Sequence, residues 1–190
     1  MTTAMGKLIY CLNVSIDGFI ETVDHGLEWA TVDEELHSWF NDQTRTLDAS
    51  LYGRRLYEVM AGHWPTAEDD PSAAEVEREF ARIWNAMPKI VFSTSLDHVE
   101  HNSRLVRGDV GAVLDGLRQE FDGDLDVGGA NLAGQFVRRG LVDEYRLVVH
   151  PVVLGAGTPF WPELEAQLPL RLVDTRTFAS GVELRSFVPS

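Results

Sequence analysis

The stretch DLDVGGANL (124–132) places two adjacent glycines between a short apolar alternation and a segment with helical spacing. Leu125 and Val127 indicate a strand, and the apolar residues after the glycines indicate a helix. The first turn of a helix presents unpaired N–H groups and a positive dipole end, and glycine lets an anion approach them. Gly128 and Gly129 are therefore candidates for a phosphate cradle. A tight turn with a positive φ, or close packing, explains the pair equally well.

Two further loops join polar side chains to the end of a predicted strand. Gly53, Arg54 and Arg55 follow a strand predicted at 49–52 and open a segment with helical spacing. A second loop follows the predicted strand 89–92 and consists of Ser93, Thr94 and Ser95. Guanidinium groups, backbone N–H groups and hydroxyls suit the phosphates and sugars of a dinucleotide. The alternatives are a solvated helix face for the arginines and ordinary turn chemistry for the hydroxyl residues.

A carboxylate, Asp17, stands just after the first predicted strand and is followed by Gly18. At the mouth of a sheet it could orient an amine or hydroxyl of a substrate, or relay a proton. An Asp-Gly turn is the structural alternative. The sequence spacing does not distinguish a functional role of Asp17 from a structural role in a turn.

Other chemistries lack their motifs: the chain has no G-x-S-x-G elbow, no G-x-x-x-x-G-K-[ST] loop and no H-E-x-x-H helix. The six histidines show no ligand spacing and there is one cysteine, so we expect neither a metal site nor an internal disulfide. A net charge of -14 argues against nucleic acids and anionic membranes as partners. Because the N-terminus resembles neither a signal peptide nor a spanning helix, we expect a cytoplasmic protein.

These candidate sites require a sheet whose strand ends converge. The apolar run 8–14 is typical of a strand buried on both faces in a parallel sheet. Strand and helix signals then alternate along the chain. Helices are predicted from about residue 32, with Thr31 and Glu34 as a capping box, after Gly53, from Pro71-Ser72 with Glu75, from Asp109 and after the glycine pair.

The C-terminal part of the chain has a different pattern. An apolar strand is predicted from Glu144 to Leu154, and 170–178 and 182–188 read as a hairpin. With 190 residues and 44% hydrophobic content, we predict a single domain over 1–190. The predicted class is α/β: a doubly wound, mostly parallel sheet flanked by helices, with an antiparallel C-terminal hairpin.

Five motifs occur in chain order and cover nearly the whole sequence: Asn13-x-Ser15-x-Asp17-Gly18-Phe19, Tyr52-Gly53-Arg54-Arg55-x-Tyr57, Val127-Gly128-Gly129-x-x-Leu132, Leu141-Val142-Asp143-Glu144 and Pro151-Val152-Val153-Leu154-Gly155-x-Gly157-x-Pro159-Phe160. Together they resemble the dihydrofolate reductase superfamily. The branch they resemble is the reductase domain at the C-terminus of bacterial bifunctional riboflavin-biosynthesis deaminase-reductases. The resemblance implies the three-layer fold of dihydrofolate reductase and a binding site for NADPH.

The resemblance also implies roles for individual residues. The cofactor would be bound by Gly53, Arg54, Arg55, Ser93, Thr94, Ser95, Gly128, Gly129, Ala130, Asn131 and Leu132. The substrate and nicotinamide would be bordered by Asn13, Ser15, Leu154 and Gly155, with Asp17 as the catalytic candidate.

The activity implied is NADPH-dependent reduction of a small heterocyclic or carbonyl substrate, as in 5-amino-6-(5-phosphoribosylamino)uracil reductase, by a homodimer. The alternatives are a non-catalytic NADPH-binding or regulatory protein and dihydrofolate reductase activity proper.

The chain departs from these relatives at three places. The family has a lysine after the Asp-Gly turn, and this chain has Phe19 there. A substrate with a phosphorylated sugar therefore fits this chain less well. The acidic residue that holds the pterin in dihydrofolate reductases has no clean equivalent, because Glu34 and Glu35 lie near it but Leu36 matches the position best. The zinc deaminase signature of the bifunctional enzymes is absent, so the chain reads as a stand-alone reductase-like domain.

Overall fold

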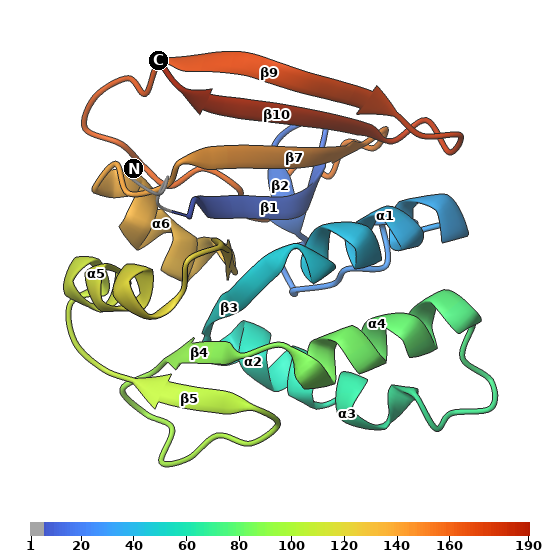
Figure 1. Ribbon diagram of the computed structural model, residues 1–190. Coiled ribbons are helices and arrows are strands. Elements are labelled where there is room, and N and C mark those ends of the chain that lie inside the picture. Colours follow the sequence, from blue (N-terminus) through green and yellow to red (C-terminus); the bar gives the residue numbers. More distant parts are fainter. Residues whose placement is uncertain (1–5) are drawn as a thin grey trace.

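The computed structural model describes residues 6–190 and consists of helices packed around one large sheet, with a second sheet of two short strands (Figure 1). The strands are β1 (Leu8–Ser15), β2 (Phe19–Glu21), β3 (Leu47–Gly53), β4 (Lys89–Phe92), β5 (Ser103–Val106), β6 (Asp124–Gly128), β7 (Glu144–His150), β8 (Thr158–Pro159), β9 (Leu170–Thr177) and β10 (Glu183–Pro189). The helices are α1 (Glu34–Arg45), α2 (Arg54–Ala61), α3 (Trp64–Ala67), α4 (Glu75–Ala86), α5 (Val110–Glu120) and α6 (Ala130–Arg138).

The large sheet has eight strands in the order β5-β4-β3-β6-β1-β7-β10-β9. The pairs from β5 to β7 are parallel, and β10 is antiparallel to both β7 and β9. The predicted α/β class, with its mostly parallel sheet and antiparallel C-terminal hairpin, is therefore confirmed. Because the parallel strands point the same way, the loops after β3, β4 and β6 leave from one edge of the sheet.

Two helical layers cover the sheet. On one face α5 and α6 bury Leu114 and Phe136 against Tyr10 and Val127 of the central strands. On the other face α1 buries Leu36 and packs against α4 (Figure 1). Alternate residues of the central strands thus meet different helices, which explains why β1 is a nearly continuous apolar run. Within residues 6–190, none of the helices is both long and apolar enough to cross a bilayer.

Two predicted helices begin later than expected. The first helix begins at Glu34 rather than near residue 32, because the Asp33 carboxylate caps it by accepting a hydrogen bond from the Leu36 N–H at 2.9 Å. The helix expected from Pro71-Ser72 begins at Glu75, because Asp70 holds those residues in a turn by accepting hydrogen bonds from the N–H and hydroxyl of Ser72. The short helix α3 was not expected. The predictions for α2, α5 with its Asp109 cap, and α6 are confirmed.

The long strand predicted from Glu144 to Leu154 is too long. The strand β7 ends at His150, because Pro151 has no N–H to donate to a ladder. After it the chain leaves the sheet, and the N–H groups of Leu154 and Gly155 donate to the Asp17 carboxylate at 3.1 and 2.7 Å. The C-terminal hairpin is confirmed as β9 and β10.

Candidate functional site

A cavity of about 830 Å³ opens at the edge of the sheet where β3, β4 and β6 end. Its walls come from β1, β2, the first turns of α2 and α6, and the loops after β4 and β5. Of the predicted cofactor residues, the lining includes Gly53, Arg54, Arg55, Ser93, Thr94, Ser95, Gly129, Ala130, Asn131 and Leu132. Three of the loops predicted from strand ends, at 53–55, 93–95 and 129–132, therefore meet at one cavity.

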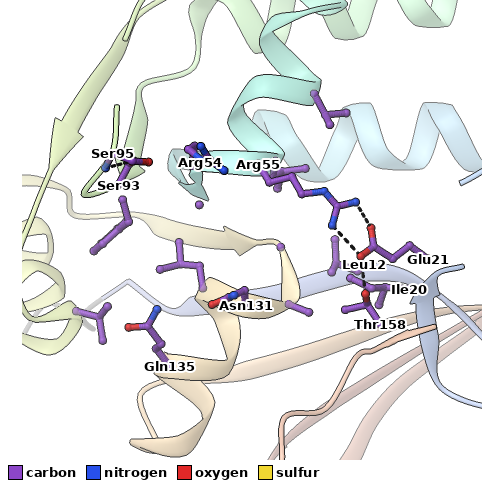
Figure 2. A pocket seen from close by; sticks show the side chains of 18 of the residues that line it. Leu12, Ile20, Glu21, Arg54, Arg55, Ser93, Ser95, Asn131, Gln135 and Thr158 are labelled. Carbon is purple, nitrogen blue, oxygen red and sulfur yellow. Dashed lines mark hydrogen bonds and ion pairs between the residues drawn. The ribbon is translucent and has the colours of Figure 1, made fainter. Parts of the chain in front are cut away.

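Polar groups of different kinds lie on opposite sides of the cavity. Figure 2 shows Ser93 and Ser95 on one side, Glu21 and Thr158 on the other, and Arg54 and Asn131 between them. We call the first the Ser93 end (Ser93, Thr94, Ser95, Arg107 and Gly108) and the second the Glu21 end (Leu12, Ile20, Glu21, His25, Arg55 and Thr158).

The Ser93 end carries positive charge without a carboxylate. Arg107 donates to the Leu96 carbonyl at 2.6 Å, a contact that leaves its charge uncompensated. Arg54, at the first position of α2, forms no ion pair among residues 6–190. Glu21 at the opposite end is the single carboxylate among the residues that line the cavity. An acidic protein thus presents a locally cationic surface here, which favours an anion.

In the part of the chain that the structure describes, two of the three helices that begin at the cavity, α2 and α6, have no side-chain cap, whereas Asp109 caps α5. Gly53 precedes α2 and Gly129 precedes α6, and neither helix has a hydrogen bond from a capping side chain. A helix start of this kind provides N–H donors and the positive end of the helix dipole. Together with Arg54 and the Ser93–Ser95 hydroxyls, this donor set is suited to the phosphates of a nucleotide.

The two adjacent glycines serve different purposes. Gly129 has φ = 86°, a left-handed conformation that favours glycine, and it lines the cavity. Gly128 does not line the cavity, and a Cβ atom there would lie 2.4 Å from Leu56 Cδ2 of α2. The packing alternative therefore applies to Gly128, which lets α2 approach β6.

The Glu21 end is organised around one buried carboxylate, which is 7% exposed. Arg55 donates to Glu21 Oε1 and Oε2 at 3.0 and 2.5 Å, and the Thr158 hydroxyl donates to Oε1 at 2.5 Å (Figure 2). His25 Nδ1 lies 2.9 Å from the same Oε1. Burial by itself would raise the pKa of Glu21, but these hydrogen bonds and the charge of Arg55 lower it below its ordinary value.

Arg55 therefore differs from Arg54 although the two are adjacent. Both line the cavity, as predicted, but the guanidinium of Arg55 is held by Glu21 in a two-pronged ion pair. The pairing of β2 with β8 brings Thr158 opposite Glu21 and completes this arrangement.

The predicted catalytic residue Asp17 does not line the cavity, and neither do Ser15, Leu154 and Gly155. These four residues lie together nearby: Asp17 accepts hydrogen bonds from the Ser15 hydroxyl at 2.7 Å and from both backbone N–H groups of 154–155. The hydrogen bond from Ser15 is the main reason that the pKa of Asp17 is lowered. A catalytic role for Asp17 stays a prediction, and its observed contacts are those of a brace between two loops.

The predicted substrate residue Asn13 does line the cavity. Its Oδ1 lies 2.9 Å from Nε2 of His150, whose ring is buried and whose pKa is lowered by that burial. A neutral His150 with its proton on Nε2 would donate to Asn13 and fix the orientation of the amide.

Sequence reasoning missed Glu21, His25 and Arg107. Arg107 follows β5 and could have been found by the strand-end argument that located the other loops. Glu21 and His25 carried no signal, because β2 has three residues, too few to show a periodicity. His25 adopts φ = 68°, a conformation rare outside glycine. No group of three or more His, Cys, Asp or Glu side chains that could bind a metal ion occurs in residues 6–190.

The chain is similar over nearly its full length to proteins of known sequence or structure. It is 32% identical over 177 residues to the uncharacterized protein YyaP of Bacillus subtilis (strain 168), covering 93% of this chain and 91% of YyaP. A structure from Shewanella sp. PV-4, of a protein assigned to riboflavin biosynthesis, superposes with a TM-score of 0.78 at 19% identity, covering 97% of this chain and 99% of that one.

A dihydrofolate reductase from Enterococcus faecalis, solved in complex with NADP(H), has a TM-score of 0.61 at 13% identity and 98% coverage of both chains. These structures establish the dihydrofolate reductase-like fold. The model of the family described as "RibD C-terminal domain" matches residues 6–184. The chain therefore belongs to the RibD C-terminal domain family.

Proposed function

We propose that this protein is a cytosolic NADPH-dependent reductase that transfers a hydride to a small heterocyclic or carbonyl substrate. The observation that carries the proposal is the cavity at the end of β3, β4 and β6. Within residues 6–190, one part of this cavity has two helix starts without a side-chain cap and arginines without an ion pair. A separate end consists of apolar side chains and one ion pair. Membership of the RibD C-terminal domain family supports it.

The residues present fit such a cofactor. The N–H groups that begin α2 and α6, together with Arg54, would hold the two linked phosphates. The Ser93, Thr94 and Ser95 hydroxyls and Arg107 would hold the further phosphate that distinguishes NADPH from NADH. The nicotinamide would then lie toward the Glu21 end.

When bound, the nicotinamide supplies the hydride; the protein supplies position, shielding and a proton. Leu12 and Ile20 would exclude water from the reacting groups. Hydride addition to a C=N or C=O bond leaves an electron pair on the heteroatom, which must take up a proton. His25 lines this end and its Nδ1 contacts Glu21, so we assign the proton donation to Nε2 of the protonated His25 ring, since imidazole is the commonest donor of this kind.

The first experiment is a titration of the purified protein with NADPH and, separately, NADH, followed by tryptophan fluorescence and melting temperature. We expect tighter binding of NADPH, and Arg54→Ala should weaken it about tenfold or more because a charge-assisted contact to phosphate is lost. Arg82→Ala, at an exposed arginine of α4 that does not line the cavity, is the matched control. Absence of binding by either cofactor would refute the proposal.

The rival is a protein that binds NADPH and never oxidises it. Turnover of NADPH with pterins, aminopyrimidines and simple carbonyl compounds separates the two, and His25→Gln should slow turnover while leaving NADPH affinity unchanged. No observation favours dihydrofolate reductase activity proper. Neither Glu34 nor Glu35 lines the cavity, and Glu35 accepts hydrogen bonds from Arg176 and from the Ala179 N–H instead.

We further propose that two copies associate through β9. This edge strand has eight residues, nearly all exposed, and Leu172 and Val173 are 51% and 43% exposed. Long exposed edges with apolar side chains favour pairing with another strand. Light scattering on a sizing column should give twice the monomer mass, and Leu172→Lys should give the monomer mass.

A further inference from the structure

We infer that the Glu21 end accepts a substrate without a phosphate or carboxylate group, an uncharged compound that offers an N–H or O–H to Glu21. The inference rests on the proposed function, because it takes the Ser93 end as the cofactor's place. What carries it is the distribution of charge along the cavity. The one arginine at the Glu21 end is already neutralised, whereas Arg54 and Arg107 are not.

Arg55 is half exposed, but its guanidinium is already paired with Glu21, so an anion would have to compete with that carboxylate. Glu21 is 7% exposed, and its carboxylate is held by three side chains at once. A phosphate that withdrew Arg55 would leave this buried carboxylate without its cation, which is far costlier than forming a surface ion pair. The same phosphate would also approach a negative charge within a few ångströms. The guanidinium therefore serves to hold Glu21 in place.

The rest of the surface at the Glu21 end is suited to an uncharged ligand. Leu12 and Ile20 form part of the wall, and the neighbouring lining residues Leu27 and Val59 are 52% and 51% exposed. Apolar side chains left open at a cavity are typical of a face that a ligand covers.

Two polar atoms near this wall retain hydrogen-bonding capacity. Glu21 Oε1 accepts three contacts, but Oε2 accepts a single one, from Arg55, and a carboxylate oxygen has two lone pairs. The amide nitrogen of Asn13, whose Oδ1 faces His150, makes no hydrogen bond within residues 6–190 and can donate to a carbonyl. A compound with both an N–H and a C=O group would match these two atoms.

The test uses a matched pair of probes, ribose 5-phosphate and ribose, titrated into the full-length protein saturated with NADP⁺. We expect no measurable binding of ribose 5-phosphate to the wild type. Glu21→Gln keeps the shape of the side chain and removes its charge, so Arg55 becomes free and ribose 5-phosphate should bind at least about tenfold more tightly. The double variant Glu21→Gln/Arg55→Gln should lose that gain.

Glu58→Gln is the matched control, since Glu58 is exposed on α2 one turn from Arg55 and its substitution changes the net charge equally. Binding of ribose 5-phosphate, but not of ribose, to the wild type would overturn the inference, and this result does not depend on whether Glu21→Gln folds. A folded Glu21→Gln variant that gains no affinity would overturn it too. If NADP⁺ itself does not bind, the proposed function fails. The affinities of Glu21→Gln and the wild type for ribose 5-phosphate, measured without NADP⁺, still show whether Glu21 keeps Arg55 from binding a phosphate.

Discussion

Asp126 lies at the centre of β6 and provides a quantitative test of how its carboxyl group is buried in the sheet. Its Oδ1 atom is shut off from solvent and has no hydrogen-bond partner among residues 6–190. Burial is the main influence on this carboxyl group and raises its pKa to about 6, although the Ser50 hydroxyl opposes the shift. The unfolded chain has an ordinary Asp pKa of about 3.9.

The direction of the pH dependence follows from these two values. Because the folded state binds the proton more tightly, its stabilising contribution is fully present below about pH 4 and is lost as the pH rises through about 6. One pH unit below the folded pKa, protonation favours the folded state by a factor of about ten, or about 1.4 kcal/mol. Between pH 8 and pH 5 the wild type should therefore gain about 1.4 kcal/mol from Asp126 alone.

We propose to measure this gain by urea unfolding of the wild type and of Asp126→Asn at both pH values. The difference in unfolding free energy between the two proteins should change by about 1.4 kcal/mol, with the variant relatively more stable at pH 8. His150, whose burial lowers its pKa, titrates in both proteins and cancels in the difference. Asp122→Asn, at an exposed position, is the control. A difference that does not vary with pH would refute the assignment of a solvent-excluded carboxyl group to Asp126.

Two further predictions concern the glycine pair and the loop brace. Gly128→Ala places a Cβ atom 2.4 Å from Leu56 Cδ2 and should lower the unfolding free energy by about 1–3 kcal/mol. The double variant Gly128→Ala/Leu56→Ala should lose less unfolding free energy than the two single variants lose together. If the losses of the single variants simply add, the packing explanation is contradicted. Asp17→Asn weakens the hydrogen bonds to the N–H groups of Leu154 and Gly155, so limited proteolysis should cut the 151–157 segment faster while NADPH affinity is unchanged. A variant that loses NADPH binding but resists cleavage would place Asp17 in the cofactor site.

The parts of the site that could be predicted from sequence are those that a strand end determines. Gly53, Arg54 and the Ser93–Ser95 loop follow strands with clear apolar patterns, and in a parallel sheet such loops meet at one edge. Sequence spacing could not separate the two glycines, since Gly128 is required by the position of Leu56, which is distant in the chain.

The Glu21 end could not be predicted, because its geometry is entirely tertiary. Glu21 meets Arg55 and Thr158, which are 34 and 137 residues away in the chain, and no local pattern encodes these contacts. For the same reason the contacts of Asp17 could not be predicted from sequence, and its catalytic role stays a prediction. Its position after a strand resembles that of the other loops, but its carboxylate is occupied by Leu154 and Gly155, 137 and 138 residues later.

The position of β1 in the middle of the sheet also has a consequence for biosynthesis. The strand β1 is synthesised well before its neighbours β6 and β7, which begin at Asp124 and Glu144, so it has no pairing partner until more than about 100 further residues have been made. Contacts between segments so far apart in the chain slow folding, and an apolar strand that waits for them is exposed to association with other chains. Premature termination before β7 should therefore yield an aggregation-prone product, and productive folding of this protein should be largely post-translational.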